Sequence, residues 1–247
     1  MAPVERDRRL LVLGAREAAL GLLEAARRRR LTVIAADADA SAPGFQLADR
    51  RALIAADDEP AIHRLAEAER IDAVLAGEDA AVGIAARVAR RCALPHPLDP
   101  DSVARATSKL RQRELLAELG IPHVPWRLAA YRVQDLGEGP ELTIHGFSIA
   151  AAFHELTPRG PAAASALAAA AVVALGIHTG PTRTTIRIAP EGLQVAQVVA
   201  RLAAEAETPL LADLIVATAL GEPVDAADLV PFAPAHGDSA DPVEAAA

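Results

Sequence analysis

Hydrophobic residues in the first hundred positions occur as short apolar runs separated by longer amphipathic segments. Strands are predicted at the runs Leu10–Leu13, Leu31–Ala36, Ala52–Ala55 and Asp72–Ala76. Runs of this length are typical of strands that a parallel sheet buries on both faces. Helices are predicted at the segments between and after them, over residues 16–30, 58–69 and 79–91. Strands that alternate with helices indicate an α/β fold, a doubly wound parallel sheet over residues 1–97.

The pattern changes in the second half of the chain. Thr184–Ile188 and Leu193–Val199 are rich in β-branched residues, and Pro190 to Gly192 supply turn residues between them. This arrangement predicts a β-hairpin. Helices are predicted over residues 161–177 and 208–220. Together these elements indicate a smaller α+β unit.

The chain is therefore expected to contain four regions. These are the α/β domain at residues 1–97, a helical linker at 98–126, the α+β unit at 127–228 and a disordered tail at 229–247. The tail is rich in Pro, Ala and Asp and has few groups that could anchor it in a core.

Composition narrows the class of protein. Hydrophobic residues make up 52% of the 247 residues and aromatic residues 2%, so the core must be aliphatic. The formal net charge of −8 argues against nucleic-acid binding, which needs cations to neutralise phosphates. A single cysteine excludes an intrachain disulfide. The uncharged segment 161–177 is Ala-rich and shorter than the ~20 residues of a membrane span, and the first residues lack signal-peptide features. We therefore expect a cytoplasmic protein without a membrane segment.

An acidic residue after the second predicted strand raises the alternative of a dinucleotide-binding fold. The glycine fingerprint of that fold is missing, because Gly14 is followed by Ala15, Arg16 and Glu17. Side chains at these positions would crowd a pyrophosphate. The sequence thus argues against a nicotinamide cofactor.

Two motifs resemble a known superfamily. The hairpin segment contains Gly180, Pro181, Arg187 and Arg201, and the linker contains Thr107, Lys109, Leu119, Gly120, Ile121, Pro122 and Pro125. With these residues the chain resembles the ATP-grasp superfamily of carboxylate–amine ligases, which includes biotin carboxylase. The resemblance runs from about residue 9 to residue 221. It implies a pre-ATP-grasp α/β domain followed by a remnant of the ATP-grasp C-terminal lobe.

The chain departs from that superfamily where ATP and Mg²⁺ are bound. Thr185 and Gln197 replace the two metal-binding carboxylates of the hairpin, so no metal ligand is expected there. Mg²⁺ prefers anionic oxygen ligands, which neither side chain supplies. The family's ATP-binding lobe, with its Gly-rich loop, is replaced by the short stretch 129–140. We therefore expect no cofactor, and ATP and Mg²⁺ only if the chain is an active ligase.

The resemblance also marks candidate site residues. It implies that Arg201 grips a substrate carboxylate or acyl phosphate as the catalytic residue, with Arg183 as a second cation beside it. Glu78 and Asp79 follow a strand end, where substrates bind in such sheets. Asp79 could instead cap the next helix. Lys109 corresponds to a lysine that contacts ATP, or is simply a surface residue.

Three functions remain open at this point. The first is a degenerate ligase relative that binds a small carboxylate, such as an amino acid, or a protein partner, and that could form homo-oligomers. The second is an active ATP-dependent carboxylate–amine ligase that uses substituted residues or borrows a lobe from another chain. The third is a purely structural subunit.

Overall fold

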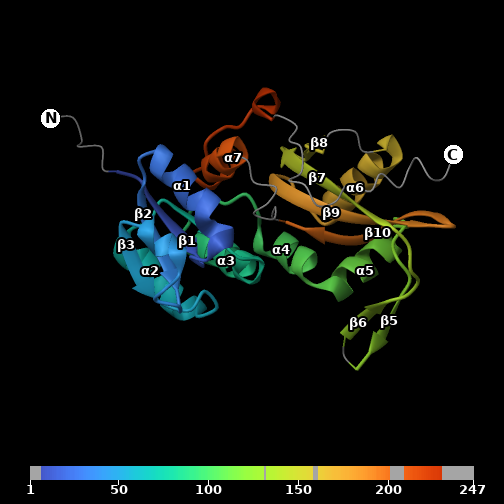
Figure 1. The fold of residues 1–247 in the computed structure, drawn as a ribbon, viewed down its shortest axis with the longest axis horizontal. Coiled ribbons are helices and arrows are strands. Elements are labelled where there is room, and N and C mark those ends of the chain that lie inside the picture. Colours follow the sequence, from blue (N-terminus) through green and yellow to red (C-terminus); the bar gives the residue numbers. More distant parts are fainter. Residues whose placement is uncertain (1–6, 131, 158–160, 201–208, 230–247) are drawn as a thin grey trace. The chain divides into compact units, whose positions relative to one another are not determined.

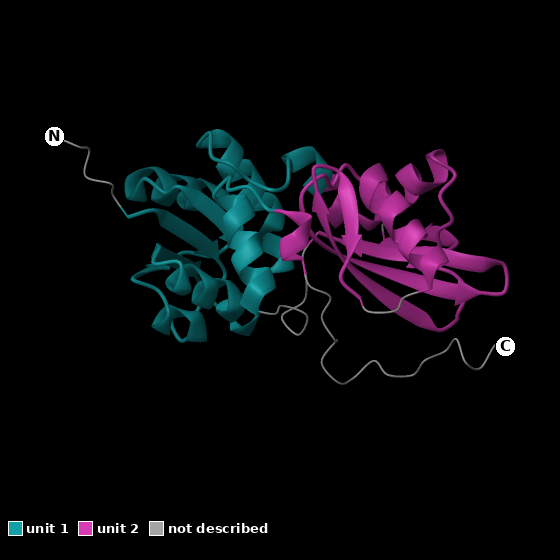
Figure 2. Ribbon diagram, turned by 90° about the horizontal axis from the view of Figure 1, so that it is seen from above, with its two compact units in different colours: residues 1–103, 207–224 teal, residues 104–206, 225–247 magenta. Residues whose placement is uncertain are grey.

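The computed structural model describes residues 7–130, 132–157, 161–200 and 209–229 (Figure 1). The chain forms two units (Figure 2). Unit 1 consists of residues 1–103 and 207–224, and unit 2 of residues 104–206 and 225–247. The expected tail at 229–247 lies outside the described residues except for its first residue.

Unit 1 is built on a parallel sheet with the strand order β3-β2-β1-β4. Its strands are β1 (Arg9–Leu13), β2 (Thr32–Asp37), β3 (Arg50–Leu53) and β4 (Ala73–Ala76). The central strand β1 pairs with β2 and β4, so that Leu11 lies opposite both Ile34 and Val74. Leu10 to Leu13 are fully buried, as expected for a strand covered on both faces.

Helices cover both faces of this sheet, as the alternating pattern predicted. They are the 3-10 helices η1 (Glu17–Ala19), η2 (Pro43–Gln46) and η3 (Asp79–Ala81), and the α-helices α1 (Leu20–Arg28), α2 (Glu59–Glu69), α3 (Val82–Arg91) and α7 (Pro209–Ala219). Helix α1 packs against α7, and α2 packs against α3. Right-handed crossovers place α1 and α2 on opposite faces, because the strand order reverses at β1.

Two features of unit 1 differ from the sequence-based expectations. Strand β3 occupies Arg50–Leu53 rather than 52–55. It is an edge strand that begins at two arginines, which precede the apolar run behind the expectation. Helix α7 belongs to unit 1, whereas its residues had been assigned to the 127–228 unit. Leu211 and other apolar residues of α7 are buried, and Arg28 of α1 contacts Asp213 at 3.2 Å.

Unit 2 contains an antiparallel sheet with the order β10-β9-β7-β8 and a separate two-stranded sheet, β5-β6. Helix α4 (Pro100–Thr107) spans the boundary between the units, which falls after Val103. The other elements of unit 2 are α5 (Lys109–Glu118), β5 (Trp126–Ala129), β6 (Arg132–Asp135), β7 (Glu141–Ile149), β8 (Ala152–Glu155), α6 (Ala162–Ala174), β9 (Gly180–Ala189), β10 (Gly192–Val199) and η5 (Ala226–Asp228). The predicted hairpin is β9–β10. Together the two units form the mixed α/β architecture that the sequence predicted.

One face of the antiparallel sheet packs against α6. Ile144 and Ile186 form a core there with Ala164 and Ala168 of the helix. Gly146 of β7 belongs to this face, and the ring of Phe153 lies directly over it. A Cβ atom at position 146 would come within 2.2 Å of the ring. Glycine is therefore required at this position by a close approach rather than by its backbone angles.

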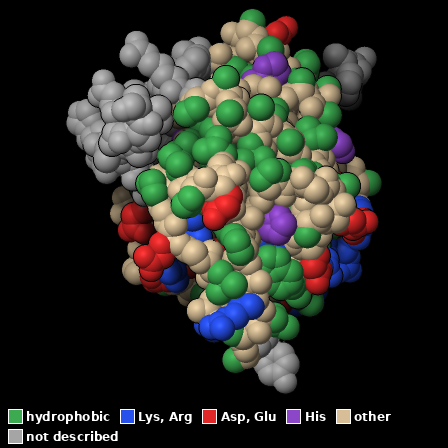
Figure 3. Space-filling view, turned by 90° about the vertical axis from the view of Figure 1, so that its right-hand side faces the viewer, with side chains coloured by type: hydrophobic (Ala, Val, Ile, Leu, Met, Phe, Trp, Pro, Cys, Tyr) green, Lys and Arg blue, Asp and Glu red, His purple; other side chains and the backbone are tan. Residues whose placement is uncertain are grey.

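The outer side of α6 is apolar as well. Helix α6 carries no charged residue, and Val173 is 47% exposed. In the view of Figure 3, hydrophobic side chains gather in the upper part of the surface, and Lys, Arg, Asp and Glu side chains lie mostly in the lower part. No helix within the described ranges combines the length and apolar character needed to cross a membrane.

Candidate functional site

The first candidate region is the carboxyl end of the parallel sheet in unit 1. The strand order reverses between β1 and β4, and ligands of open α/β sheets bind outside such a switch point. Gly14 follows β1 with φ +86°, and its N–H donates to the Ala36 carbonyl at 2.8 Å. The N–H of Gly77, which follows β4, donates to the Leu13 carbonyl at 2.7 Å. These bonds fix the two loops that leave the adjacent strands.

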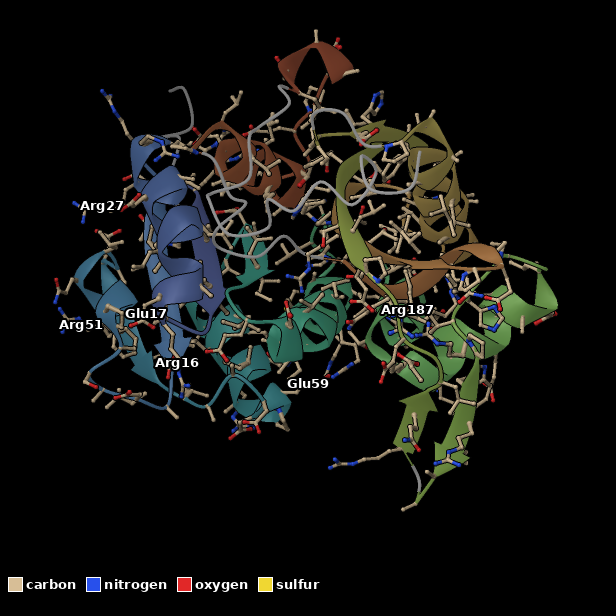
Figure 4. All side chains as sticks on the ribbon, turned by 45° about the vertical axis from the view of Figure 1, so that its right-hand side comes forward. Arg16, Glu17, Arg27, Arg51, Glu59 and Arg187 are labelled. Atoms are coloured by element: carbon tan, nitrogen blue, oxygen red, sulfur yellow. The ribbon has the colours of Figure 1, made fainter. Side chains whose placement is uncertain are left out.

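Glu78 and Arg16 face each other across these loops. The Glu78 side chain lies over Gly14, since a Cβ atom at that glycine would be 2.8 Å from the Glu78 Cγ. Arg16 Nε is 3.7 Å from Glu78 Oε1, and the two side chains are 60% and 33% exposed. Glu17, the next residue, is also exposed (Figure 4). The sequence alone marks Arg16 only as a side chain that would crowd a pyrophosphate, because its contact with Glu78 depends on the order of the strands.

The acidic residues beside this pair have mostly structural contacts. Asp37 is 4% exposed and accepts hydrogen bonds from the N–H groups of Ala15 and Asp39, at 2.8 and 2.9 Å. Asp39 accepts from the Ser41 hydroxyl and N–H, and these bonds lower the pKa of Asp39. Asp37, the last residue of β2, therefore holds the neighbouring loops in place. Asp79 is the first residue of η3, and the N-cap position belongs to Glu78 rather than to Asp79.

The second candidate region is the polar face of the antiparallel sheet in unit 2. Thr185 of β9 lies opposite Gln197 of β10 and opposite Thr143 of β7. The three residues thus form one row across three strands, on the face opposite to Ile186 and α6. A β-bulge separates Gln197 from Val195. Thr185 and Gln197, the two positions that the resemblance assigns to metal ligands, are therefore adjacent in space. Both side chains are uncharged, as is that of Thr143.

The arginines of this face have different surroundings. Arg183 pairs in register with His145 of β7 and with Val199 of β10. Arg187 is bound within the chain: it donates to Glu141 Oε1 at 2.8 Å and to the carbonyls of Leu136 and Gly137 at 3.3 and 3.1 Å (Figure 4). Arg201 lies outside the described residues, so its predicted role stays a prediction.

Lys109, at the start of α5, has a definite ion-pair partner. Its Nζ is 2.7 Å from Asp135 Oδ2 of β6, and Arg113 Nη2 is 3.1 Å from Asp135 Oδ1. The Asp135 carboxylate thus links β6 to α5 through two ion pairs. No sequence pattern pointed to this cluster, because its members lie in different elements.

Within the described ranges, no group of three or more His, Cys, Asp or Glu side chains is placed to hold a metal ion. Neutral Thr143, Thr185 and Gln197 do not match the ligand preference of Mg²⁺.

Comparison with solved structures identifies the fold. Phosphoribosylglycinamide synthetase from Anaerococcus prevotii superposes with a TM-score of 0.75 at 14% identity, over 88% of this chain and 76% of that chain. L-amino acid ligase from Bacillus licheniformis gives 0.75 at 19% identity, over 92% and 78%. Carboxyaminoimidazole ribonucleotide synthase from Aspergillus clavatus, complexed with ATP, gives 0.72 at 16%, over 92% and 80%.

At these identities the likeness shows a shared fold and does not transfer an activity. No protein-family model matches the chain, and no curated protein matches its sequence. The function must therefore be argued from the residues of the two candidate regions.

Proposed function

Because the chain has the fold of the ATP-grasp carboxylate–amine ligases, we propose that it is a degenerate relative. In this proposal it binds a small carboxylate ligand of the amino-acid class and does not carry out Mg²⁺–ATP chemistry. The observation that carries the proposal is the row of Thr143, Thr185 and Gln197. In this superfamily the hairpin supplies carboxylates to Mg²⁺, and a row of neutral oxygens does not offset the dehydration of the ion.

The short connection between β5 and β7 supports the same proposal. After β5, residue 130 and residues 132–140, the described part of this connection, contain one short strand, β6, and the link to β7. The ATP-binding lobe that the resemblance places here would cover the adenine and exclude water from phosphoryl transfer. A two-stranded hairpin offers neither a Gly-rich loop nor a hinge strand.

The ligand class follows from the Arg16–Glu78 pair. A guanidinium and a carboxylate at a switch point are complementary to the two charges of an amino acid. The ligand carboxylate would bind Arg16, and its ammonium group would bind Glu78. Each charge-assisted hydrogen bond of this kind contributes about 1.5–3 kcal/mol, roughly ten- to a hundredfold in affinity.

The test of the ligand site is calorimetry with a panel of amino acids and simple carboxylates. Arg16→Gln and Glu78→Gln should each weaken binding about ten- to a hundredfold. Glu17→Gln is the matched control, because it removes a neighbouring exposed charge. If both variants fold and bind as the parent does, the ligand does not use this pair. A protein partner would then be the better proposal.

The test of the missing chemistry uses ATP and Mg²⁺. The parent should show no Mg²⁺-dependent ATP binding below about 1 mM, an affinity limit near −4 kcal/mol. The double variant Thr185→Glu with Gln197→Glu places two carboxylates side by side on the hairpin and should gain Mg²⁺ binding. Thr143→Glu alone is the control for added charge on the same face.

An active ligase is the second candidate, and the fold shared with an amino-acid ligase favours it. It requires substituted metal ligands or a lobe from another chain. Formation of ADP that depends on an amino acid, or a micromolar ATP site in the parent, would establish this alternative over the degenerate relative.

A further inference from the structure

Arg113 of α5 is a charged side chain that is fully buried. It is 0% exposed and is one of the largest completely buried side chains among the described residues. Its Nη2 group donates to Asp135 and to the carbonyl of Ala196, the residue within the β10 bulge. Its Nε and Nη1 groups are also buried, and neither has a hydrogen-bond partner within the described part of the chain. The guanidinium therefore has more donors than its surroundings satisfy.

Lys109 lies one helical turn before Arg113 and shares its carboxylate. Its Nζ contacts Asp135 Oδ2 at 2.7 Å, while its side chain remains 43% exposed. Gln112, the residue directly before Arg113, bonds to the backbone of Val198 and adds no charge. Two cations thus share one carboxylate, and the cluster keeps one formal positive charge. Lys109 connects this buried charge with solvent.

Burial makes the surplus charge unfavourable. A buried cation is stable only when its charge and its donors are matched, and unsatisfied donors on a guanidinium are especially costly. Burial alone raises the pKa of Asp135, but the hydrogen bond from Lys109 and the charge of Arg113 outweigh it and lower that pKa overall. The carboxylate is therefore ionised at neutral pH, and a second anionic oxygen would still be accommodated by charge.

We propose that Lys109 and Arg113 form a binding site for a small oxyanion and that Asp135 keeps this site closed by standing in for the ligand. A guanidinium presents parallel N–H groups that match the oxygens of a phosphate or a carboxylate group. The incoming anion takes the place of the Asp135 carboxylate on Lys109 and on Arg113. Inorganic phosphate and acetate represent the two ligand chemistries.

Asp135 lies where its carboxylate can move away from Lys109 and Arg113 without disturbing the core. It is the last residue of β6, in a sheet of only two strands that projects beside α5 (Figure 1). Two-stranded sheets are marginally stable on their own, and Leu128 near the tip is 57% exposed. Releasing Asp135 from α5 therefore disturbs little of the core of unit 2.

The chain contains a natural reporter for this exchange. Trp126 of β5 lies directly opposite Asp135 in the β5–β6 register, and it is the single tryptophan of the sequence. A shift of the Asp135 side chain or of β6 changes the surroundings of the indole. Tryptophan fluorescence thus follows the site without any label.

The first experiment is a phosphate titration of Asp135→Asn by calorimetry, with chloride replacing phosphate at equal ionic strength. Removing the competing carboxylate should tighten phosphate binding at least about tenfold over the parent. Lys109→Gln in the same background should abolish that gain. Glu138→Gln, an exposed change of equal charge in the link to β7, should leave binding at the parent level. Parallel titrations with acetate decide between a phosphate and a carboxylate ligand.

The second experiment uses the parent protein, so that it holds even if Asp135→Asn does not fold. Phosphate or acetate should change Trp126 fluorescence saturably, and Lys109→Gln should remove the change while the exposed Arg111→Gln retains it. The proposal is overturned if folded Asp135→Asn binds neither anion, or if Lys109→Gln leaves binding intact. If that variant is unfolded, an unchanged parent fluorescence with both anions overturns it.

Discussion

The two sheets of this molecule place their polar groups in different ways. In the parallel sheet of unit 1, Leu10 to Leu13 and all of β4 are buried, so the polar groups of these two strands lie at or beyond the strand ends. In the antiparallel sheet of unit 2, neighbouring residues of β9 alternate: Thr184 is buried towards α6, and Thr185 lies on the polar face. A parallel sheet thus confines a site to its loops, whereas an antiparallel sheet can carry one along a strand.

The largest expected effect tests the interior of the parallel sheet. Leu11→Ala removes a fully buried side chain from the central strand and should lower the free energy of unfolding by about 2–5 kcal/mol. Amino-acid binding by the folded fraction should be unchanged, because the Leu11 side chain is fully buried in the core and is not exposed at the strand end. Denaturant unfolding measures the first quantity and calorimetry the second. Leu128→Ala, at an exposed position, should change stability by less than about 0.5 kcal/mol.

A smaller effect separates the two faces of the antiparallel sheet. The Thr184 hydroxyl is buried without a hydrogen-bond partner in the described part of the chain. Thr184→Val replaces it with a methyl group of the same shape and should raise stability by about 1 kcal/mol. Thr185→Val on the other face should be near neutral. Equal effects at both positions, measured by thermal unfolding, would contradict the assignment of faces.

The smallest effect concerns acid stability and compares one aspartate from each unit. Asp39 and Asp135 both have a pKa below the ordinary 3.8, so each ionised form stabilises the folded state above about pH 4. This contribution is lost as the pH falls through the folded-state pKa. Asp39 is at the surface, and Asp135 is enclosed by two cations. In the parent, the free energy of unfolding should decrease as the pH is lowered from about 5 to about 3. Asp135→Asn should reduce this decrease more than Asp39→Asn does, as measured by denaturant unfolding at each pH.

Much of the fold follows from short-range pattern. Strands β1, β2 and β4 were predictable because a buried parallel strand is a continuous apolar run. Strands β5, β6 and β8 were not predicted, since they are four residues long and mostly exposed or half-buried. The place of α7 in unit 1 depends on packing against α1, which chain order does not reveal.

The candidate sites, like the fold, contain some contacts that a sequence pattern predicts and others that it does not. The hairpin was predictable, but its turn alone sets a register in which Ala196 would lie opposite Thr185. The β-bulge after Val195 brings Gln197 to that place instead, and the sequence pattern did not indicate the bulge. The Arg113–Asp135 contact joins residues 22 positions apart in different elements. Arginine is also among the residues least expected in a core. The Arg16–Glu78 pair required the strand order, which a sequence pattern alone does not determine.

The close contact between Gly146 and Phe153 has a consequence for how this sequence can change. Alanine at position 146 would collide with the aromatic ring, and a smaller residue at 153 would leave a void over the glycine. Each single substitution is unfavourable, while the two together exchange one well-packed pair for another. In a library randomised at both positions, folded variants should therefore combine glycine with a large residue or alanine with a small one. Positions 146 and 153, seven residues apart on the paired strands β7 and β8, are therefore expected to change together.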